Sequence, residues 1–191
     1  MATEYEAKFL NIDIDELRTR LSSAGATLER PEYLQKRWVF DLPKERHSLD
    51  SFVRVRDEGD IVTMTWKHFQ GDKIDDQKEV EIVVDSFENA AEILTQIGCT
   101  PRSYQESKRE LWSLADAEFM IDTWPYFETY VEVEANSEDA VREAAIKAGF
   151  DWDKALFCGV SKLFQMKYGE HMHMRNVPKI TFDMPNPFVE K

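Results

Sequence analysis

The sequence predicts an α+β protein in which about eight antiparallel strands close into a barrel, with helices packed against its outside. Two features favour this fold class. Short segments throughout the chain alternate charged and apolar residues, which is the pattern of a strand whose two faces have different surroundings. Three of these segments precede an amphipathic stretch that stops at a glycine, which is typical of a short helix after a strand.

The strand and helix units recur along the chain, which indicates an internal repeat. They cover residues 4–25, 79–98 and 132–149, and each opens with two glutamates separated by one residue. The strands expected after the first and second helices also resemble each other, at residues 33–38 and 104–112. We therefore predict a strand–helix–strand unit that is used twice, as a pseudo-two-fold repeat. The expected N-cap residues of the three helices are Asp13, Asp85 and Ser137.

Charged side chains share one face of several expected strands. In the first strand, Glu4, Glu6 and Lys8 lie on one face, whereas the apolar residues between them point the other way. The same alternation predicts a charged face on strands further along the chain. The other charges expected on such faces are Arg54, Arg56, Lys67, Glu79, Glu81, Asp122, Glu132 and Glu134.

Two arrangements account for these charged faces. In the first, each strand belongs to a one-sided sheet whose charges face water. Ordinary solvent faces also contain Thr, Ser, Gln and Asn, however, and here Glu, Arg or Lys recur in strand after strand. In the second, the charges line a barrel lumen, where they need partners because burial of unpaired charge is costly. A divalent metal on the carboxylates and a polyanion on the Arg and Lys side chains would supply those partners.

Length and composition favour one domain followed by a tail. The 191 residues include 42% apolar side chains, enough for one sizeable core, and no linker-like stretch divides the chain before about residue 168. We expect residues 1–167 to form the domain and residues 168–191, which contain three prolines, to form a C-terminal tail. The tail is expected either to wrap the barrel or to mediate self-association, for instance as a homodimer.

Charge and cysteine content exclude several classes of protein. A formal net charge of −13 argues against a general nucleic-acid binder, because phosphate contacts need a basic surface. The chain shows neither a secretory signal nor an apolar run long enough to span a membrane, and Cys99 and Cys158 lack metal-ligand spacing. We therefore expect a cytoplasmic protein with free thiols.

The order of the charged residues resembles that of the CYTH superfamily, also called the triphosphate tunnel metalloenzymes, over about residues 1–167. Family members include class IV adenylyl cyclases, thiamine triphosphatases, inorganic tripolyphosphatases and RNA triphosphatases. The resemblance implies an eight-stranded antiparallel tunnel and metal-dependent chemistry on a triphosphate. The residues that carry it are Glu4-x-Glu6-x-Lys8, Arg54-x-Arg56, Lys67, Glu79-x-Glu81, Arg109, Asp122 and Glu132-x-Glu134.

The resemblance also implies a role for each charged residue, with Glu4, Glu6 and Lys8 as the catalytic group. The carboxylates would hold Mg²⁺ or Mn²⁺: Glu4, Glu6 and Glu134 first, with Glu132, Glu81 and Asp122 behind them. The basic residues would bind the phosphates: Lys8, Arg37, Arg54, Arg56, Lys67 and Arg109. The expected activity is hydrolysis of tripolyphosphate or a nucleoside triphosphate. The alternatives are a class IV-type cyclase that makes cyclic AMP from ATP, and a module that binds polyphosphate or nucleotide without turnover.

One strand departs from the family pattern. Where family members often carry an aspartate and a tyrosine, this chain has Arg37 and Val39. A tyrosine there acts with the motif lysine in thiamine triphosphatases, so its absence argues against thiamine triphosphate as the substrate. It also leaves the activation of the attacking water open. Arg37 would either add a cation to the tunnel or form a salt bridge on the outside.

Overall fold

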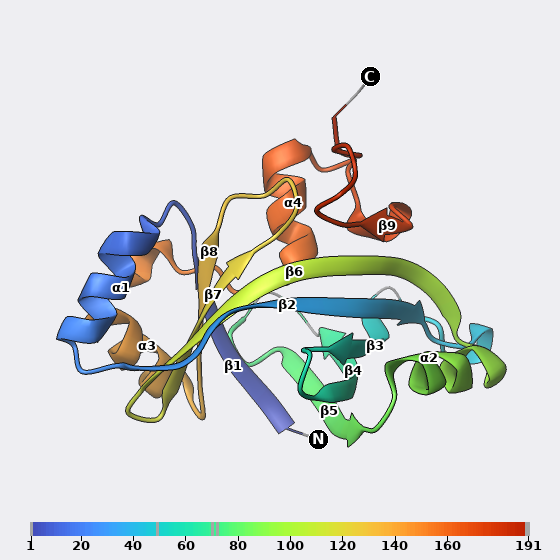
Figure 1. Cartoon of the computed structure of the whole chain (residues 1–191), viewed down its shortest axis with the longest axis horizontal. Helices are drawn as coiled ribbons and strands as arrows, with labels where there is room; N and C mark the ends of the chain where they lie inside the picture. The colour runs from blue at the N-terminus through green and yellow to red at the C-terminus, as the bar shows by residue number, and fades with distance from the viewer. Residues whose placement is uncertain (1, 49, 70, 72, 190–191) are drawn as a thin grey trace.

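The computed structural model describes residues 2–48, 50–69, 71 and 73–189, apart from the side chains of Ala2 and Glu4. A strongly curled β-sheet forms its centre and helices pack on the outside (Figure 1). Within the described residues the strands are β1 (Ala2–Phe9), β2 (Thr27–Asp41), β3 (Ser51–Asp57), β4 (Val62–Phe69), β5 (Gln77–Val84), β6 (Thr100–Leu114), β7 (Ala117–Thr123), β8 (Tyr130–Ala135) and β9 (Lys179–Ile180). The α-helices are α1 (Ile14–Ser23), α2 (Phe87–Gln96), α3 (Glu138–Lys147) and α4 (Val160–Tyr168), and short 3₁₀ turns cover Lys44–Arg46, Trp152–Lys154 and Met174–Asn176.

The curled sheet has the order β2-β3-β4-β5-β1-β8-β7-β6, with each neighbouring pair antiparallel, and β9 lies parallel to β6. The long strands β2 and β6 also pair with each other along most of their length. The contact between β5 and β1, in contrast, covers only residues 77–79 and 2–4, whereas the contact between β1 and β8 covers residues 5–9 of β1. The predicted α+β class is therefore confirmed, but the expected closed barrel is wrong, because the sheet forms a strongly curled half-barrel.

The alternation along β1 positions charge inside the curl and apolar groups outside it. Ala7 and Phe9 are buried in the main apolar cluster, which also contains residues of α1 and α3. Glu6 and Lys8 point to the opposite, concave side, where they line a cavity. This is the arrangement expected of a strand with period-two side chains. The sequence therefore predicted correctly which face of β1 carries the polar site.

Two of the three predicted helix caps are confirmed. The side chain of Asp13 accepts a hydrogen bond from the Glu16 backbone N–H at 2.9 Å, and Ser137 caps α3 in the same way. The predicted cap Asp85 is wrong, because Ser86 caps α2 by accepting from the Asn89 N–H at 3.1 Å. Ser86 still has an extended backbone, so the helix begins one residue later than expected.

The predicted repeat is visible in the order of the elements. The segments β1–α1–β2 and β5–α2–β6 have the same order, and their long strands run antiparallel against each other. Helices α1 and α3 lie together on one side of the sheet, and α2 lies on the other (Figure 1). Leu17 and Leu21 of α1 pack into the first cluster, whereas Ala90 and Leu94 of α2 pack against β3. Apolar burial on both outer sides leaves the concave interior to the charged residues.

The C-terminal segment packs on the rest of the molecule. Phe188 and Ile180 are buried with Phe164 of α4 in an apolar cluster, and the Tyr126 hydroxyl donates to the Thr181 carbonyl at 2.7 Å. The strand β9 adds a short parallel pairing to β6. The described part of the tail thus wraps the sheet, which is the first of the two expected arrangements. In the part of the chain that the structure describes, no helix is both long and apolar enough to cross a membrane.

Candidate functional site

The concave side of the sheet encloses a cavity of about 640 Å³. Side chains from β1 to β8 reach it, so residues far apart in the sequence face one another. Glu4 lies in β1 opposite Gln77, but its side chain is outside the described part of the structure. The other predicted site residues all line the cavity: Glu6, Lys8, Arg37, Arg54, Arg56, Lys67, Glu81, Arg109, Asp122, Glu132 and Glu134.

The carboxylate wall of the cavity consists of the inward side chains of β1 and β8. Lys8 is only 2% exposed and forms ion pairs with Glu6 and with Glu132, whose Oε1 lies 3.2 Å from Nζ. Burial opposes the charge of Lys8, but the two carboxylates more than compensate and raise its pKa. Burial likewise opposes ionisation of Glu132, yet Lys8, Arg109 and Lys67 lower its pKa to about 2. Both groups are therefore charged at neutral pH.

Glu6 and Glu134 are the described pair that best suits a hard divalent cation. They are direct cross-strand partners between β1 and β8, which brings the two side chains close together. The Gln77 amide also donates to Glu6 Oε1 at 2.9 Å, which fixes that carboxylate. Carboxylate oxygens are the ligands that Mg²⁺ and Mn²⁺ prefer. Among the described side chains, however, no group of three or more acidic, His or Cys residues is gathered for a metal.

Arg109 of β6 links the carboxylate wall to the rest of the cavity. Its guanidinium donates to both carboxylate oxygens of Asp122, at 2.7 and 2.6 Å, and to Glu132 at 2.9 Å. Asp122 is almost fully buried, and burial together with the charge of Glu132 raises its pKa despite Arg109. The bidentate contact fixes the plane of the Arg109 guanidinium, which a phosphate-binding arginine requires.

The arginine wall lies on the inner faces of β2 and β3, where Arg37 stands directly opposite Arg56. Arg37 points into the cavity, so its alternative placement on the outside is excluded. It donates to the neutral oxygens of Gln35 and Ser107 and stacks over the Trp124 ring, with 4.5 Å between Cζ and the ring centroid. Burial and the nearby guanidinium groups of Arg54, Arg56 and Arg109 lower the pKa of Arg37 to about 9. The nearby guanidinium groups thus add to the cost of burying Arg37, and an anion would offset that cost.

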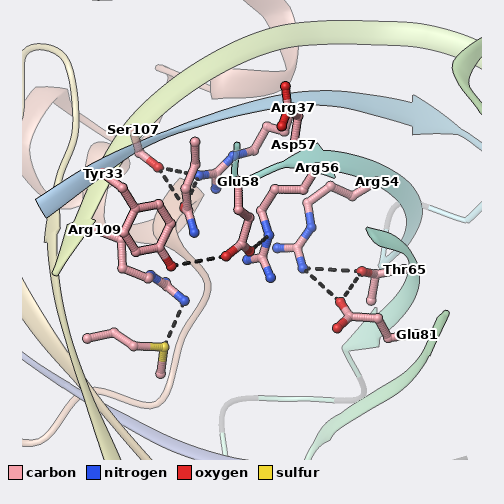
Figure 2. Close-up of polar contacts among 12 residues, drawn as sticks. Tyr33, Arg37, Arg54, Arg56, Asp57, Glu58, Thr65, Glu81, Ser107 and Arg109 are labelled. Atoms are coloured by element: carbon pink, nitrogen blue, oxygen red, sulfur yellow. Dashed lines mark hydrogen bonds and ion pairs between the residues drawn. The ribbon is translucent and has the colours of Figure 1, made fainter. Parts of the chain in front are cut away.

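Glu81 belongs to the arginine wall rather than to the carboxylate wall. Its Oε2 lies 3.6 Å from a guanidinium nitrogen of Arg54 and accepts from the Thr65 hydroxyl at 2.6 Å (Figure 2). Lys67 forms the corresponding pair with Glu79 at 3.3 Å. These contacts run across β3, β4 and β5. The structure therefore brings Glu81 together with phosphate-binding candidates, and not with Lys8 and Glu132.

Sequence reasoning missed Tyr33 and Glu58, which lie beside the arginine wall. The Tyr33 hydroxyl donates to Glu58 Oε2 at 3.0 Å, and Glu58 Oε1 lies 2.6 Å from Arg56 Nε (Figure 2). Glu58 sits in the β3–β4 turn, where three acidic residues and a glycine gave no signal that one of the carboxylates is buried. Val39, which stands where family members often carry a tyrosine, lines the cavity as expected. This position therefore presents no hydroxyl to the cavity.

Comparison with known proteins places the chain in a family. The CYTH domain family model matches residues 2–158, which is most of the chain. The chain belongs to the CYTH domain family. The resemblance found in the sequence is thereby confirmed. No curated protein matches this CYTH chain.

Several solved structures share the CYTH fold of this chain. PH1012 from Pyrococcus horikoshii has a TM-score of 0.69 at 17% identity, over 82% of this chain and 96% of that one. A Vibrio parahaemolyticus protein described as a candidate adenylate cyclase has a TM-score of 0.71 at 12% identity, over 86% and 98%. The Hippeastrum protein HpAC1, described as having a dominant triphosphatase activity, has a TM-score of 0.58 at 15% identity, over 88% and 96%. At these identities the likeness establishes the fold alone.

Proposed function

We propose that this CYTH protein is a divalent-metal-dependent phosphohydrolase. Its triphosphate substrate, either tripolyphosphate or a nucleoside triphosphate, would bind inside the curled sheet. The observation that carries the proposal is the arginine wall. Four guanidinium groups, those of Arg37, Arg54, Arg56 and Arg109, line the cavity, and burial together with the charge of the other three lowers the pKa of Arg37 to about 9. Arg54, Arg56 and Arg109 pair with carboxylates, whereas Arg37 donates to neutral oxygens, so a multivalent anion would offset its buried charge. Guanidinium groups also match phosphate oxygens geometrically.

The metal belongs to the carboxylate wall in this proposal. Glu6 and Glu134 would hold Mg²⁺ or Mn²⁺, with Glu4 and Glu132 beside them; Glu81 and Asp122, which contact arginines, would support the phosphate-binding residues. When bound, the ion would neutralise phosphate charge and activate a water molecule. The chemical fit rests on the oxygen ligands of Glu6 and its cross-strand partner. Closure of the sheet into a complete tunnel around the polyanion is part of the same proposal, and the pairing of β2 with β6 supports it.

The residues of the chain would act by position and charge, since phosphoryl transfer requires little covalent work from the protein. Arg109, fixed by Asp122, would hold phosphate oxygens in one orientation, and the arginine wall would bind the remaining phosphates. Lys8 remains protonated and would stabilise charge that develops on the reacting phosphate. We assign this chemistry to residues 1–167 and a covering role to residues 168–191.

A cyclase that makes cyclic AMP from ATP is the second candidate function. It needs a surface for the adenine ring, and Phe52 and Phe69 of the cavity wall stack on each other with 6.1 Å between ring centroids. Aromatic rings of this kind suit a planar base. A module that only binds its ligand is the candidate from another class. It is supported by Val39, which occupies the position where a tyrosine assists the chemistry in thiamine triphosphatases.

A product assay tests the proposal. Tripolyphosphate, ATP and thiamine triphosphate are offered in parallel with Mg²⁺ or Mn²⁺, and orthophosphate and cyclic AMP are measured. We expect metal-dependent orthophosphate release, which Glu6→Gln lowers by about a hundredfold to a thousandfold because it removes a charge at the reacting centre. Glu16→Gln, on the exposed side of α1, is the matched control and should keep full activity.

The outcomes of that assay separate the candidates. Cyclic AMP as the main product would select the cyclase. Tight ligand binding without product over hours would select the binding module. Full orthophosphate release by Glu6→Gln would contradict the assignment of the carboxylate wall.

A further inference from the structure

A buried carboxylate in the β3–β4 turn faces the arginine wall. Glu58 follows β3, and its backbone N–H donates to the Ile61 carbonyl at 2.9 Å across the turn. Turn side chains usually lie in water, but Glu58 is only 9% exposed. Its Oε1 lies 2.6 Å from Arg56 Nε, so it neutralises one guanidinium of the wall from outside the cavity.

Tyr33 and Arg30 of β2 hold this carboxylate in place. The Tyr33 hydroxyl donates to Glu58 Oε2 at 3.0 Å, and the Arg30 guanidinium donates to the Glu58 backbone carbonyl at 2.6 Å. Arg30 also stacks over the Tyr33 ring at 3.5 Å and pairs with Asp60 at 2.8 Å. Burial and the charge of Glu58 raise the pKa of Tyr33, so its phenol keeps the proton that it donates. The contacts lock the turn against the start of β2.

The locked turn stands at the boundary of the cavity. Arg56 and Arg109 line the cavity, whereas the described lining contains neither Tyr33 nor Glu58. Figure 2 shows Tyr33 and Glu58 together in the space between Arg109 and Arg56. A fixed negative charge therefore lies one layer of side chains behind the guanidinium groups that line the cavity.

We propose that Glu58, fixed by Tyr33 and Arg30, is a chain-length stop that admits a triphosphate and rejects a longer polyphosphate. This rests on the proposed function, since it concerns the same anion site. The arginines attract the phosphates, but a phosphate that extended past Arg56 and Arg109 would have to displace a carboxylate that is already paired and held behind them. Placing like charges together against the wrong ligand is an effective way to gain specificity. Glu58 is thus a specificity-determining residue rather than a catalytic one.

Calorimetric binding of sodium tripolyphosphate and sodium tetrapolyphosphate tests this stop. The ratio of the two dissociation constants is the readout, because a general change of charge alters both in parallel. We expect wild-type protein to prefer tripolyphosphate, and Glu58→Gln to shift the ratio toward tetrapolyphosphate by about tenfold or more. Glutamine keeps the shape and the bond from Tyr33 but removes the charge.

Two further variants keep the test decisive. Asp116→Asn removes a charge from the exposed turn between β6 and β7, which takes no part in holding Glu58, so the ratio should stay at the wild-type value. Tyr33→Phe loosens the stop without removing its charge and should shift the ratio in the same direction as Glu58→Gln, by less. It serves as the test if Glu58→Gln does not fold, which circular dichroism would reveal.

Two results would overturn the stop while leaving the proposed function intact. One is a wild-type protein that binds both polyphosphates equally well. The other is a Glu58→Gln ratio that equals the wild-type ratio although tripolyphosphate binds. If neither the wild type nor any variant binds either polyphosphate, the stop fails, and the proposed function fails as well if ATP with Mg²⁺ also does not bind.

Discussion

The two charged walls of the cavity differ in how their neighbours balance the buried charges. On the carboxylate wall, Lys8 stands between Glu6 and Glu132, and the pair of carboxylates raises its pKa. On the arginine wall, Arg37 donates to the neutral oxygens of Gln35 and Ser107, and burial together with neighbouring cations lowers its pKa to about 9. The first wall supports the fold through its own ion pairs. On the second wall, Arg54 and Arg56 pair with Glu81 and Glu58, but Arg37 donates to neutral oxygens, so a bound anion would stabilise it.

Removal of Lys8 should produce the largest loss of stability. Lys8→Met leaves Glu6 and Glu132 buried without their shared cation, which costs about 3–5 kcal/mol in comparable buried pairs. Urea unfolding of the wild type and the variant measures this difference. A loss below about 1 kcal/mol would mean that the carboxylate wall does not support the fold.

Acid should weaken the carboxylate wall through Glu132. Burial opposes its ionisation, but Lys8 and other cations lower its pKa to about 2 from the ordinary 4.5. A carboxyl group whose pKa is lowered by folding stabilises the folded state at pH values above its unfolded pKa. This stabilisation, here a few kcal/mol, is lost as the pH falls from 4.5 toward 2. Glu132→Gln lacks this contribution, so the gap in unfolding free energy between it and the wild type should shrink from pH 7 to pH 3. A constant gap would contradict the ion pairing of Glu132.

The arginine wall should respond in the opposite direction. Arg37→Gln removes one of four mutually repelling guanidinium groups, so the protein without ligand should gain about 1 kcal/mol of stability. The same change removes a charged hydrogen-bond donor for phosphate, and tripolyphosphate affinity should fall by about tenfold to a hundredfold. Thermal unfolding and calorimetry measure the two quantities separately. If the variant is less stable than the wild type without ligand, the contrast between the walls is wrong.

The smallest effect is expected outside the cavity. Arg18 of α1 binds Glu110 through two hydrogen bonds of 3.1 and 2.7 Å, but the Arg18 side chain is 43% exposed. Arg18→Ala should therefore cost about 1 kcal/mol or less. Tripolyphosphate affinity should remain at the wild-type value. A clear loss of affinity would mean that the outer surface, and not the two walls, decides binding.

The sequence predicted much of the fold because the alternation of side chains is local. The charged face of β1, the three strand and helix units, and the caps Asp13 and Ser137 all follow from residues close together in the chain. The start of α2 was misplaced by one residue, since Asp85 and Ser86 are both good cap residues. The extent of closure depends on how far β1 pairs with β5, which is a long-range property that local pattern does not encode.

The candidate site was predictable in its composition but not in its pairing. Alternation identified most of the charged residues that line the cavity, and the family resemblance ordered them. Neither the alternation nor the resemblance revealed that Glu81 contacts Arg54 rather than the carboxylate wall, because that contact depends on the register of three strands. Glu58 was missed for a similar reason. Its contacts with Tyr33 and Arg56 distinguish it from its solvent-exposed neighbours in the turn.

Thermal unfolding of the wild-type protein against increasing tripolyphosphate, with and without Mg²⁺, tests most directly whether the arginine wall is built for a polyanion. A ligand that binds only the native state must raise the unfolding midpoint in proportion to the logarithm of its concentration above the dissociation constant. We predict a progressive rise for the wild type and for Arg18→Ala, and a much smaller rise for Arg37→Gln. A wild-type midpoint that stays constant as tripolyphosphate is added would contradict the account.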